Sequence, residues 1–329
     1  GARVRLLKQR QRGDILRAEV SLTRGRPRGQ LLILGHLDTV YEPGTLKRTP
    51  FRLRRGRAYG PGTLDMKSGL VQALFAVDAL KAMNLHPAAR LVFLFTSDEE
   101  IGSAAGRPVL EREARRSHAV LVVEPASGEH GALKTARKGV GEFTLEVTGR
   151  AAHAGIEPGQ GVNAIEELAA QIVRLKKLER DGVTLNANVI EGGTRTNVIA
   201  AQARVRVDVR IARRADGPWI EKRIRSLRPV NRRAKLTVRG GINRPPLERT
   251  PEVVRLFQHA QMVARSFDME LEESSTGGGS DGSFTSALGV PTLDGLGGVG
   301  GGAHTAEEFV FVGKMPERAC LLASLLLTL

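Results

Sequence analysis

Five side chains of this sequence are of the types that bind zinc, and they are spread over most of the chain: His36, Asp65, Glu100, Glu124 and His304. Carboxylate oxygens and imidazole nitrogens are common zinc ligands, and a catalytic zinc keeps a position open for water or substrate. Glu99, the neighbour of Glu100, adds a further carboxylate. The set therefore predicts a pair of metal ions that promote a reaction.

Three of these positions follow short apolar runs. Residues 31–34 precede His36, residues 91–95 precede Glu99 and Glu100, and residues 119–123 precede Glu124. Such runs are typical of strands buried on both faces of a parallel sheet, and ligands bind where the carboxyl ends of these strands converge. A buried carboxylate without a partner is costly, and a bound cation removes that cost. Taken one at a time, each residue could also be an ordinary loop acid or a hydrogen-bonded histidine.

The composition is ordinary for a globular protein, with 41% hydrophobic and 26% charged residues among 329. This length allows two domains, and no stretch reaches the ~20 apolar residues of a membrane-spanning helix. The net charge of +15 would suit a nucleic-acid partner, but the basic residues are scattered and only 4% are aromatic, so we predict none. The single cysteine, Cys320, lies in an apolar terminal run that predicts a docked helix with a buried thiol.

The hydrophobic pattern divides the sequence into three segments. Residues 1–138 alternate buried strands with helices, as in a mainly parallel α/β sheet, and the apolar residues 66–83 predict a helix covered by other elements. Residues 139–247 have one-sided strands in the order β-α-β-β-α-β, which is that of a ferredoxin-like α+β domain. Residues 248–329 return to the first pattern, and their glycine-dense stretches 277–279 and 295–302 suit either a backbone close to a site or a flexible loop.

Seven short motifs surround the polar residues named above. They are Gly35-His36-Leu37-Asp38-Thr39-Val40, Gly60-Pro61-Gly62 through Asp65-Met66-Lys67-Ser68-Gly69, Ser97-Asp98-Glu99-Glu100-Ile101-Gly102-Ser103, Glu124-Pro125, Gly302-Ala303-His304-Thr305, Gly149-Arg150-Ala151-Ala152-His153-Ala154-Gly155 and Gly192-Gly193-Thr194-Arg195-Thr196-Asn197-Val198. In content and order they closely resemble the di-zinc exopeptidase and aminoacylase family. The nearest branch is that of glutamate carboxypeptidase, related to acetylornithine deacetylase and succinyl-diaminopimelate desuccinylase.

The resemblance implies a zinc exopeptidase catalytic domain, residues 1–138 and 248–329, with an inserted lid and dimerisation domain, residues 139–247. It implies two zinc ions per subunit, with cobalt or manganese as substitutes. Asp65 would bridge the two ions, His36 and Glu124 would complete one site, and Glu100 and His304 would complete the other. Glu99 would be the general base, taking a proton from water and returning it to the departing amine nitrogen.

Three residues have roles that the sequence leaves open. Asp38 is two residues after His36, so on a continuing strand it would share a face with that ligand and orient it; capping the next turn is the alternative. Glu99 could equally be an acid at a helix start. By resemblance, His153 would reach from the lid of a partner subunit to stabilise the oxyanion, which implies a homodimer; a histidine flanked by alanines is otherwise more often structural.

Asn197, Arg210 and Arg244 are the residues that, by resemblance, would hold a substrate carboxylate, which an arginine fork matches with two hydrogen bonds. Arg210 could instead be one of several solvated arginines on its strand. We predict an enzyme that cleaves the amide bond next to a terminal carboxylate of a small peptide. The alternatives are a deacylase of N-acyl amino acids and, less favoured, a non-catalytic binding protein on the same scaffold.

The sequence starts at Gly1 and has no signal-peptide pattern. We expect a cytoplasmic protein without a membrane partner. A periplasmic or secreted location stays open, because processing could have removed a leader, and family members usually have some tens of helical residues before the first strand.

Overall fold

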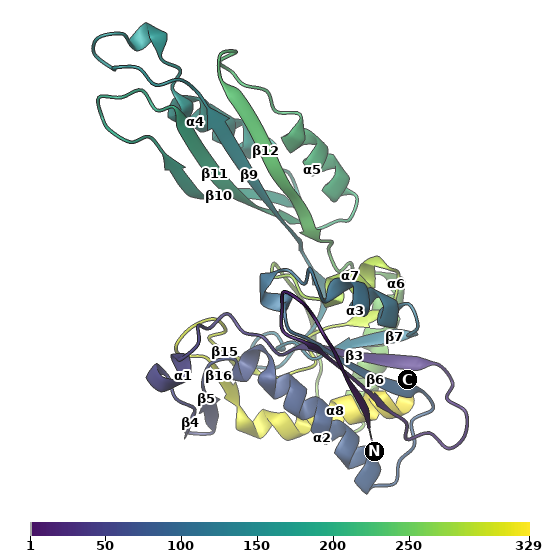
Figure 1. Cartoon of the computed structure of the whole chain (residues 1–329). Helices are drawn as coiled ribbons and strands as arrows, with labels where there is room; N and C mark the ends of the chain where they lie inside the picture. Colours follow the sequence, from purple (N-terminus) through teal and green to yellow (C-terminus); the bar gives the residue numbers. More distant parts are fainter. Residues whose placement is uncertain (1) are drawn as a thin grey trace. The chain divides into compact units, whose positions relative to one another are not determined.

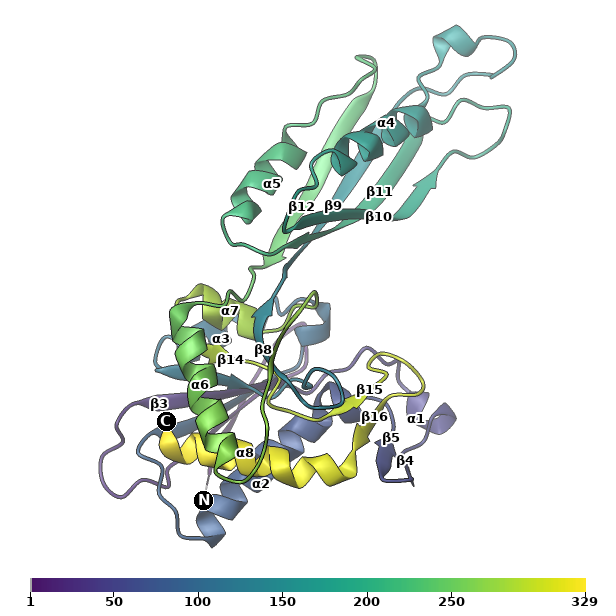
Figure 2. The ribbon, with the colours of Figure 1, turned by 180° about the vertical axis from the view of Figure 1, so that it is seen from behind.

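The computed structural model describes residues 2–329, which form two compact units (Figures 1 and 2). Unit 1 contains the residues up to Arg137 together with Leu247–Thr276 and Ser280–Leu329, and unit 2 contains Lys138–Pro246 and Gly277–Gly279. Most of unit 2 is thus a continuous insertion between two parts of unit 1. The three glycine-segment residues 277–279 group with unit 2, although the sequence pattern assigned them to the last segment.

Unit 1 is built on a six-stranded sheet. In spatial order its strands are β1 (Arg3–Leu7), β2 (Ile15–Val20), β6 (Arg90–Thr96), β3 (Gln30–His36), β7 (Ala119–Val122) and β14 (Thr292–Leu293). The centre is parallel, because β3 pairs in parallel with β6 and β7, and β14 pairs in parallel with β7. Strand β2 runs antiparallel to β6, and β1 runs antiparallel to β2.

Helices cover both faces of this sheet. On one face lie α2 (Ser68–Ala82), α6 (Pro251–Arg265) and α8 (Met315–Thr328), which pack on Leu31 and Ile33 of β3. On the other face lie α3 (Arg107–Ala114) and α7 (Gly282–Ala287), which pack on Leu32 and Leu34. Every residue of β3 is buried, which explains its continuous apolar sequence. The predicted mainly parallel α/β fold is confirmed.

Small elements complete unit 1. One sheet contains β15 (Gly300–Gly301), β16 (Phe309–Phe311), β5 (Arg57–Tyr59) and β4 (Arg52–Arg54), and a second pairs β13 (Glu273–Thr276) with β8 (Leu133–Arg137). The short helical turns are α1 (Thr45–Arg48), η1 (Thr63–Lys67), η2 (Glu99–Ile101) and η4 (Val312–Lys314).

A buried guanidinium holds the glycine-dense stretch 295–302. Arg318 of α8 is fully buried and donates to the carbonyl oxygens of Gly297 at 3.2 Å, Gly131 at 2.9 Å and Gly295 at 2.5 Å. Burial lowers the pKa of Arg318 to about 10. An added Cβ at Gly297 would lie 2.2 Å from the carbonyl oxygen of Val123, so this stretch is a close backbone contact rather than a flexible loop.

Three details of unit 1 differ from the sequence-based expectations. Strands β1 and β2 precede the first predicted strand; both are short and only partly buried, so their apolar signal is weak. Helix α2 is not covered all round, because Leu74 and Phe75 are exposed. Cys320 is exposed and not a buried thiol, since it lies on the outer side of α8.

Unit 2 has the predicted ferredoxin-like order. Its elements are β9 (Gly139–Thr148), η3 (Pro158–Gln160), α4 (Ala164–Lys176), β10 (Val183–Gly192), β11 (Gln202–Ile211), α5 (Asp216–Arg225) and β12 (Lys235–Arg244), and the sheet order is β10-β11-β9-β12. Helices α4 and α5 cover one face (Figure 2) and share a core with the inward side chains of the strands. Asn163 caps α4 by accepting from the backbone nitrogens of Ile165 at 3.0 Å and Glu166 at 3.4 Å.

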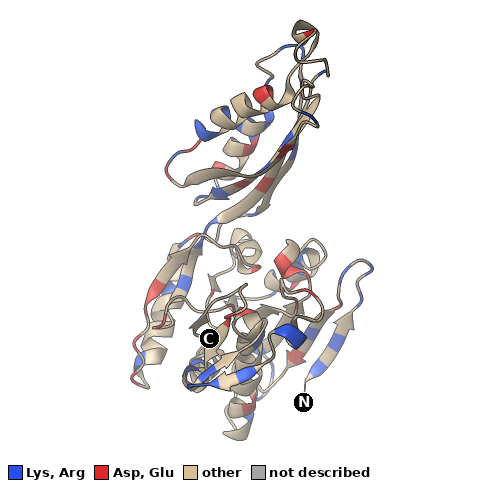
Figure 3. Cartoon of the chain, turned by 90° about the vertical axis from the view of Figure 1, so that its left-hand side faces the viewer, with Lys and Arg blue, Asp and Glu red and all other residues tan. Residues whose placement is uncertain are grey.

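The other face of the unit 2 sheet is exposed and charged. Arg204 pairs with Glu191 and Arg206 pairs with Glu142, each at 2.8 Å, which accounts for the strict alternation of β11. Lys and Arg are distributed over many elements of both units rather than gathered in one place (Figure 3). Among the residues from 2 to 329, no helix combines the length and the apolar character needed to cross a bilayer.

Candidate metal centre

The carboxyl ends of three neighbouring strands carry the first group of predicted ligands. His36 is the last residue of β3, Glu99 and Glu100 begin the turn after β6, and Glu124 lies two residues after β7. Because β3 pairs in parallel with both β6 and β7, the three chain segments leave the sheet at the same edge. Each of these four side chains is mostly or fully buried.

Asp65 lies between two groups of side chains. It belongs to η1, the turn that leads into α2, and the peptide bond after it is cis. One carboxylate oxygen, Oδ1, is 3.2 Å from Nε2 of His36, and the other, Oδ2, is 3.3 Å from Nε2 of His304. One residue therefore contacts both histidines, each through a different oxygen.

The two remaining predicted ligands each join one histidine. Glu124 Oε1 is 3.6 Å from His36 Nε2, and Glu100 Oε2 is 3.5 Å from His304 Nε2. Ligand atoms of His36, Asp65 and Glu100 lie within 4.8 Å of one another, and so do those of His36, Glu99 and Glu124. The structure thus brings all five predicted ligands and Glu99 into one cluster.

Two features of this cluster suit divalent cations: the chemistry of its donor atoms, and a buried carboxylate oxygen that has no hydrogen-bond partner among the described residues. Three carboxylates and two imidazoles converge here, an arrangement that a cation bound by oxygen and nitrogen atoms stabilises. Glu100 Oε1 is buried and has no hydrogen-bond partner among the described residues. A buried carboxylate oxygen in that state is unfavourable unless a cation occupies the space beside it.

Asp38 orients His36 and also caps a turn. Nδ1 of His36 is 3.0 Å from the backbone oxygen of Asp38 and 3.5 Å from its carboxylate oxygen Oδ1. Because Nδ1 donates to this carbonyl in the neutral ring, the lone pair of Nε2 faces Asp65 and Glu124. The second carboxylate oxygen of Asp38 accepts from the backbone nitrogen of Glu100 at 3.0 Å. Asp38 thus contacts the His36 ring, and the turn that it caps is the one after β6 rather than the turn that follows Asp38 in the sequence.

Within unit 2, the other predicted site residues fall into two places. His153 follows the end of β9 and Asn197 precedes the start of β11, and the two segments are adjacent. The backbone nitrogen of Ala154 donates to the backbone oxygen of Asn197 at 3.0 Å. Arg210 lies near the opposite end of β11, eight residues after Gln202 and hence about 25 Å away along the strand. The two pairs of residues do not meet within one copy of unit 2.

The two arginines lie beside the segment 277–279. Arg210 donates three hydrogen bonds to the Asp208 carboxylate, at 2.8 to 3.1 Å, and one to the carbonyl oxygen of Gly277 at 3.0 Å. Arg244 ends β12, and an added Cβ at Gly279 would lie 3.0 Å from its Cδ. Arg210 is therefore paired rather than simply solvated, which the sequence did not indicate.

Comparison with known proteins assigns the sequence that carries this cluster to a family. A model of Peptidase family M20/M25/M40 matches residues 32–328. The chain belongs to this peptidase family. A curated relative, carboxypeptidase G2 from Pseudomonas sp. (strain RS-16), is 31% identical over 318 residues, which cover 94% of this chain and 76% of the relative.

Solved structures agree with the M20 assignment in their fold. Aminopeptidase PepT from Bacillus cereus has a TM-score of 0.79 at 23% identity and covers 95% of this chain and 83% of its own. The M20 family metallo-carboxypeptidase Sso-CP2 from Sulfolobus solfataricus has a TM-score of 0.75 at 16% identity and covers 99% and 90%. The predicted family and fold are confirmed: the protein is an M20 metallopeptidase, a metal-dependent hydrolase of peptide substrates.

Two groups that the sequence did not single out support the centre of this M20 peptidase. Glu308, just before β16, is 1% exposed and accepts from the backbone nitrogens of Gly62, Leu64 and Asp65 at 2.8 to 2.9 Å, so it fixes the Asp65 turn. Arg137 binds Asp294 through two hydrogen bonds of 2.7 and 2.8 Å and lies 3.7 Å from Glu124.

Burial and mutual contacts change the protonation of the cluster. Burial, followed by the charge of Asp65, raises the pKa of Glu124 to about 7. Burial disfavours the charged imidazole of His36, but hydrogen bonds to Asp38 and Asp65 outweigh it and hold the pKa of His36 well above its usual value. Both groups therefore carry protons near pH 7 when no cation is bound, and a ligand must lose its proton to bind one.

We expect zinc binding to the metal-free protein to release about one to two protons near pH 7, because His36 and Glu124 must both deprotonate. The apparent affinity for zinc rises with pH up to the folded pKa values. In the metal-free protein, Glu124 has a pKa of about 7 when folded and 4.5 when unfolded, so the folded state binds more protons between these two values. The free energy of unfolding therefore decreases as the pH rises from 4.5 to about 7. Calorimetric titration in buffers of different ionisation enthalpy measures the release, and a buffer-independent heat at pH 7 would contradict this prediction.

Proposed function

We propose that the protein is a di-zinc carboxypeptidase that cleaves the amide bond preceding a carboxyl-terminal residue, with glutamate as the preferred residue released. The observation that carries the proposal is Asp65, whose two oxygens contact the two histidines of the cluster and are thus suited to bridge two ions. The 31% identity to carboxypeptidase G2 over 94% of the chain supports the choice of substrate class.

Each ion has its own candidate ligands on this proposal. His36 and Glu124 would hold one zinc ion, Glu100 and His304 would hold the other, and Asp65 would be shared. When bound, the two ions supply Lewis-acid polarisation of the scissile carbonyl and a lowered pKa of the attacking water. Asp38 keeps the His36 ring in the tautomer that leaves Nε2 for a cation.

Glu99 is the proposed general base. The residue is 7% exposed, and one of its carboxylate oxygens lies within 4.8 Å of ligand atoms of His36 and Glu124. From this position it would take a proton from the attacking water and deliver it to the amine nitrogen as the C–N bond breaks. The two proton transfers restore Glu99 to its carboxylate form, so the residue is ready for the next substrate.

His153 is the proposed donor to the developing oxyanion. Its Nδ1 accepts from the backbone nitrogens of Gly155 at 3.1 Å and Ile156 at 3.2 Å. In the neutral ring the proton is then on Nε2, and this exposed nitrogen can donate to a carbonyl oxygen. The backbone of the lid thus sets the tautomer that the reaction needs.

A homodimer would explain why unit 2 carries two separated groups of site residues. Because His153 and Asn197 lie about 25 Å along the sheet from Arg210, a single lid does not offer all of them to one small substrate. We propose that Arg210 and Arg244 bind the substrate carboxylate of their own subunit, and that His153 and Asn197 serve the partner's site. Sedimentation velocity of the active protein showing only monomer would rule out this arrangement.

A substrate panel tests the proposed function. We expect zinc-loaded protein to hydrolyse peptides that end in glutamate. It should prefer each one over its carboxyl-terminal amide by about 10²-fold or more in kcat/KM, because the amide has no anion for the half-buried Arg210 and Arg244 to bind. N-acetyl amino acids are the matched comparison for the deacylase alternative. Faster turnover of the N-acetyl series, or equal rates for acid and amide, would replace the carboxypeptidase proposal.

A further inference from the structure

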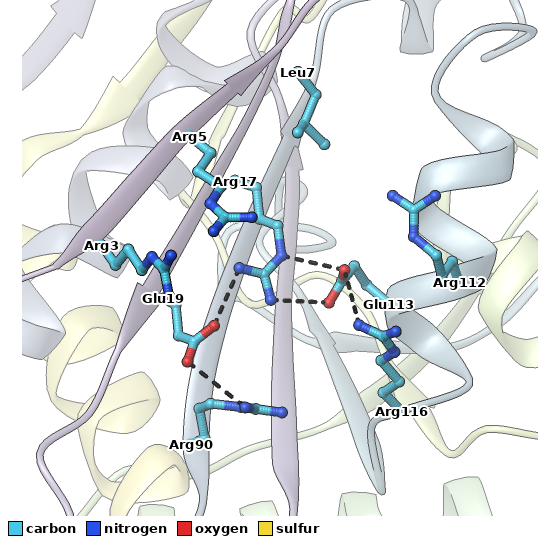
Figure 4. A pocket seen from close by; sticks show the side chains of 9 residues that line it. All are labelled: Arg3, Arg5, Leu7, Arg17, Glu19, Arg90, Arg112, Glu113 and Arg116. Atoms are coloured by element: carbon cyan, nitrogen blue, oxygen red, sulfur yellow. Dashed lines mark hydrogen bonds and ion pairs between the residues drawn. The ribbon is translucent and has the colours of Figure 1, made fainter.

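A pocket of about 340 Å³ lies in unit 1 between the strands β1 and β2 and the helix α3 (Figure 4). Six arginines line it: Arg3, Arg5, Arg17, Arg90, Arg112 and Arg116. Arg90 is the first residue of β6, whereas the metal cluster follows its last residue, Thr96. The seven residues of β6 span about 20 Å. The pocket therefore lies at the amino ends of the central strands, and the candidate metal centre lies at their carboxyl ends.

The pocket has an excess of positive charge. Its six guanidinium groups face two carboxylates, Glu19 and Glu113, which leaves four positive charges without a lining counterpart. Both carboxylates are already engaged by Arg17, which contacts Glu113 through Nε at 3.2 Å and Glu19 through Nη1 at 3.2 Å. In addition, Nη1 of Arg90 lies 3.6 Å from Oε1 of Glu19.

Three of the arginines have no such counter-charge. Among the described residues, no carboxylate lies within 4.0 Å of the guanidinium groups of Arg3, Arg5 and Arg112, whose side chains are exposed. Arg5 lies directly opposite Arg17 in the β1–β2 register. Two like charges in that relation destabilise a strand pair, and an anion between them would reverse the effect.

The floor of the pocket is held in place by buried contacts. The side chain of Arg17 is 14% exposed and that of Glu113 is 3% exposed. Gln30 donates to Ser117 Oγ at 3.0 Å and to Glu113 Oε2 at 3.4 Å, and it accepts from Arg90 at 2.9 Å. Because these groups are already ordered, an anion that binds here orders only the outer arginines.

The geometry points to a binding site for a diphosphate group, as in inorganic pyrophosphate or a nucleoside diphosphate. Guanidinium forks match phosphate oxygens with paired hydrogen bonds, and an excess of four positive charges suits a multiply charged diphosphate better than a single carboxylate. The lining contains no aromatic side chain on which a base could stack, and Leu7 is its only apolar residue. The diphosphate group itself is therefore the recognised part, independently of the proposed peptidase function.

Calorimetric titration of zinc-loaded protein tests the site, with inorganic pyrophosphate, ADP and orthophosphate as probes in ~0.15 M salt. The test variant replaces Arg3, Arg5 and Arg112 with glutamine. Its matched control replaces Arg26, Arg54 and Arg55, three exposed arginines outside the pocket that carry the same total charge. Zinc content per chain is measured after each titration, because pyrophosphate also binds zinc.

We expect one pyrophosphate site per chain whose affinity falls at least about 10-fold in the test variant and less than about 2-fold in the control, since only the former removes pocket contacts. ADP should bind within about 10-fold of pyrophosphate, and orthophosphate should bind at least about 10-fold more weakly. Peptide hydrolysis should be unchanged in both variants. Equal losses in the two variants would reduce the effect to general charge, and unchanged binding in the test variant would remove the site.

Discussion

Glu99→Gln is expected to lower kcat for peptide hydrolysis about 10³-fold while the protein keeps its metal ions. Glutamine has the same shape as glutamate but cannot take up a proton, so water loses its base and the leaving amine loses its acid. Because Glu99 is buried in a cluster with His36 and Glu124, bulk water does not readily replace it. Steady-state kinetics and metal content per chain, measured on the same preparation, check both halves of this expectation.

Metal content separates a base from a ligand at this position. If Glu99 acts as the base, the variant retains the zinc content of the unmodified protein while kcat falls. If Glu99 is instead a ligand beside His36 and Glu124, zinc content falls together with activity. Glu129→Gln, at an exposed position, is the matched control and should retain full activity. Turnover of the Glu99 variant within about 10-fold of the unmodified protein would refute the assignment.

The elements that the sequence could predict are those with a strong local signal. Strand β3 is buried along its whole length, so its apolar run identified it as a central parallel strand, and His36 at its end followed from that. The strands of unit 2 could also be predicted, because β11 alternates between core residues and ion-paired arginines on the outer face. The position of ligands at strand ends is a property of parallel sheets, and it needs no knowledge of the partners.

The parts that the sequence could not predict depend on contacts between distant residues. Glu308 accepts hydrogen bonds from a turn more than 240 positions earlier, and nothing in its neighbourhood distinguishes it from a surface acid. The ion pair of Arg137 with Asp294 is of the same kind. Arg210 was weighed as solvated or substrate-binding, but its pairing with Asp208 depends on rotamers rather than on spacing. Helix α2 was misjudged because an exposed apolar face has the same composition as a buried one.

These supporting contacts make Asp65 the most sensitive position of the centre. Glu308 holds the backbone of the turn, so a change of the Asp65 side chain alone leaves the turn in place. Asp65→Asn keeps the size of the side chain but replaces one carboxylate oxygen by an amide NH2 group, which is a donor and cannot ligate a cation. The variant therefore removes the shared ligand with little disturbance of the fold.

We expect Asp65→Asn to bind zinc at least about 10²-fold more weakly and to lose hydrolysis to the background rate, because both histidine groups depend on the same carboxylate. Chelation should abolish activity of the unmodified protein, and zinc should restore it, whereas the variant should not recover. Asp78→Asn, exposed on α2, is the matched control for the lost charge. Two zinc ions and normal turnover in the Asp65 variant would mean that the ions do not share a ligand, and the two-ion proposal would then fail even if the family assignment stands.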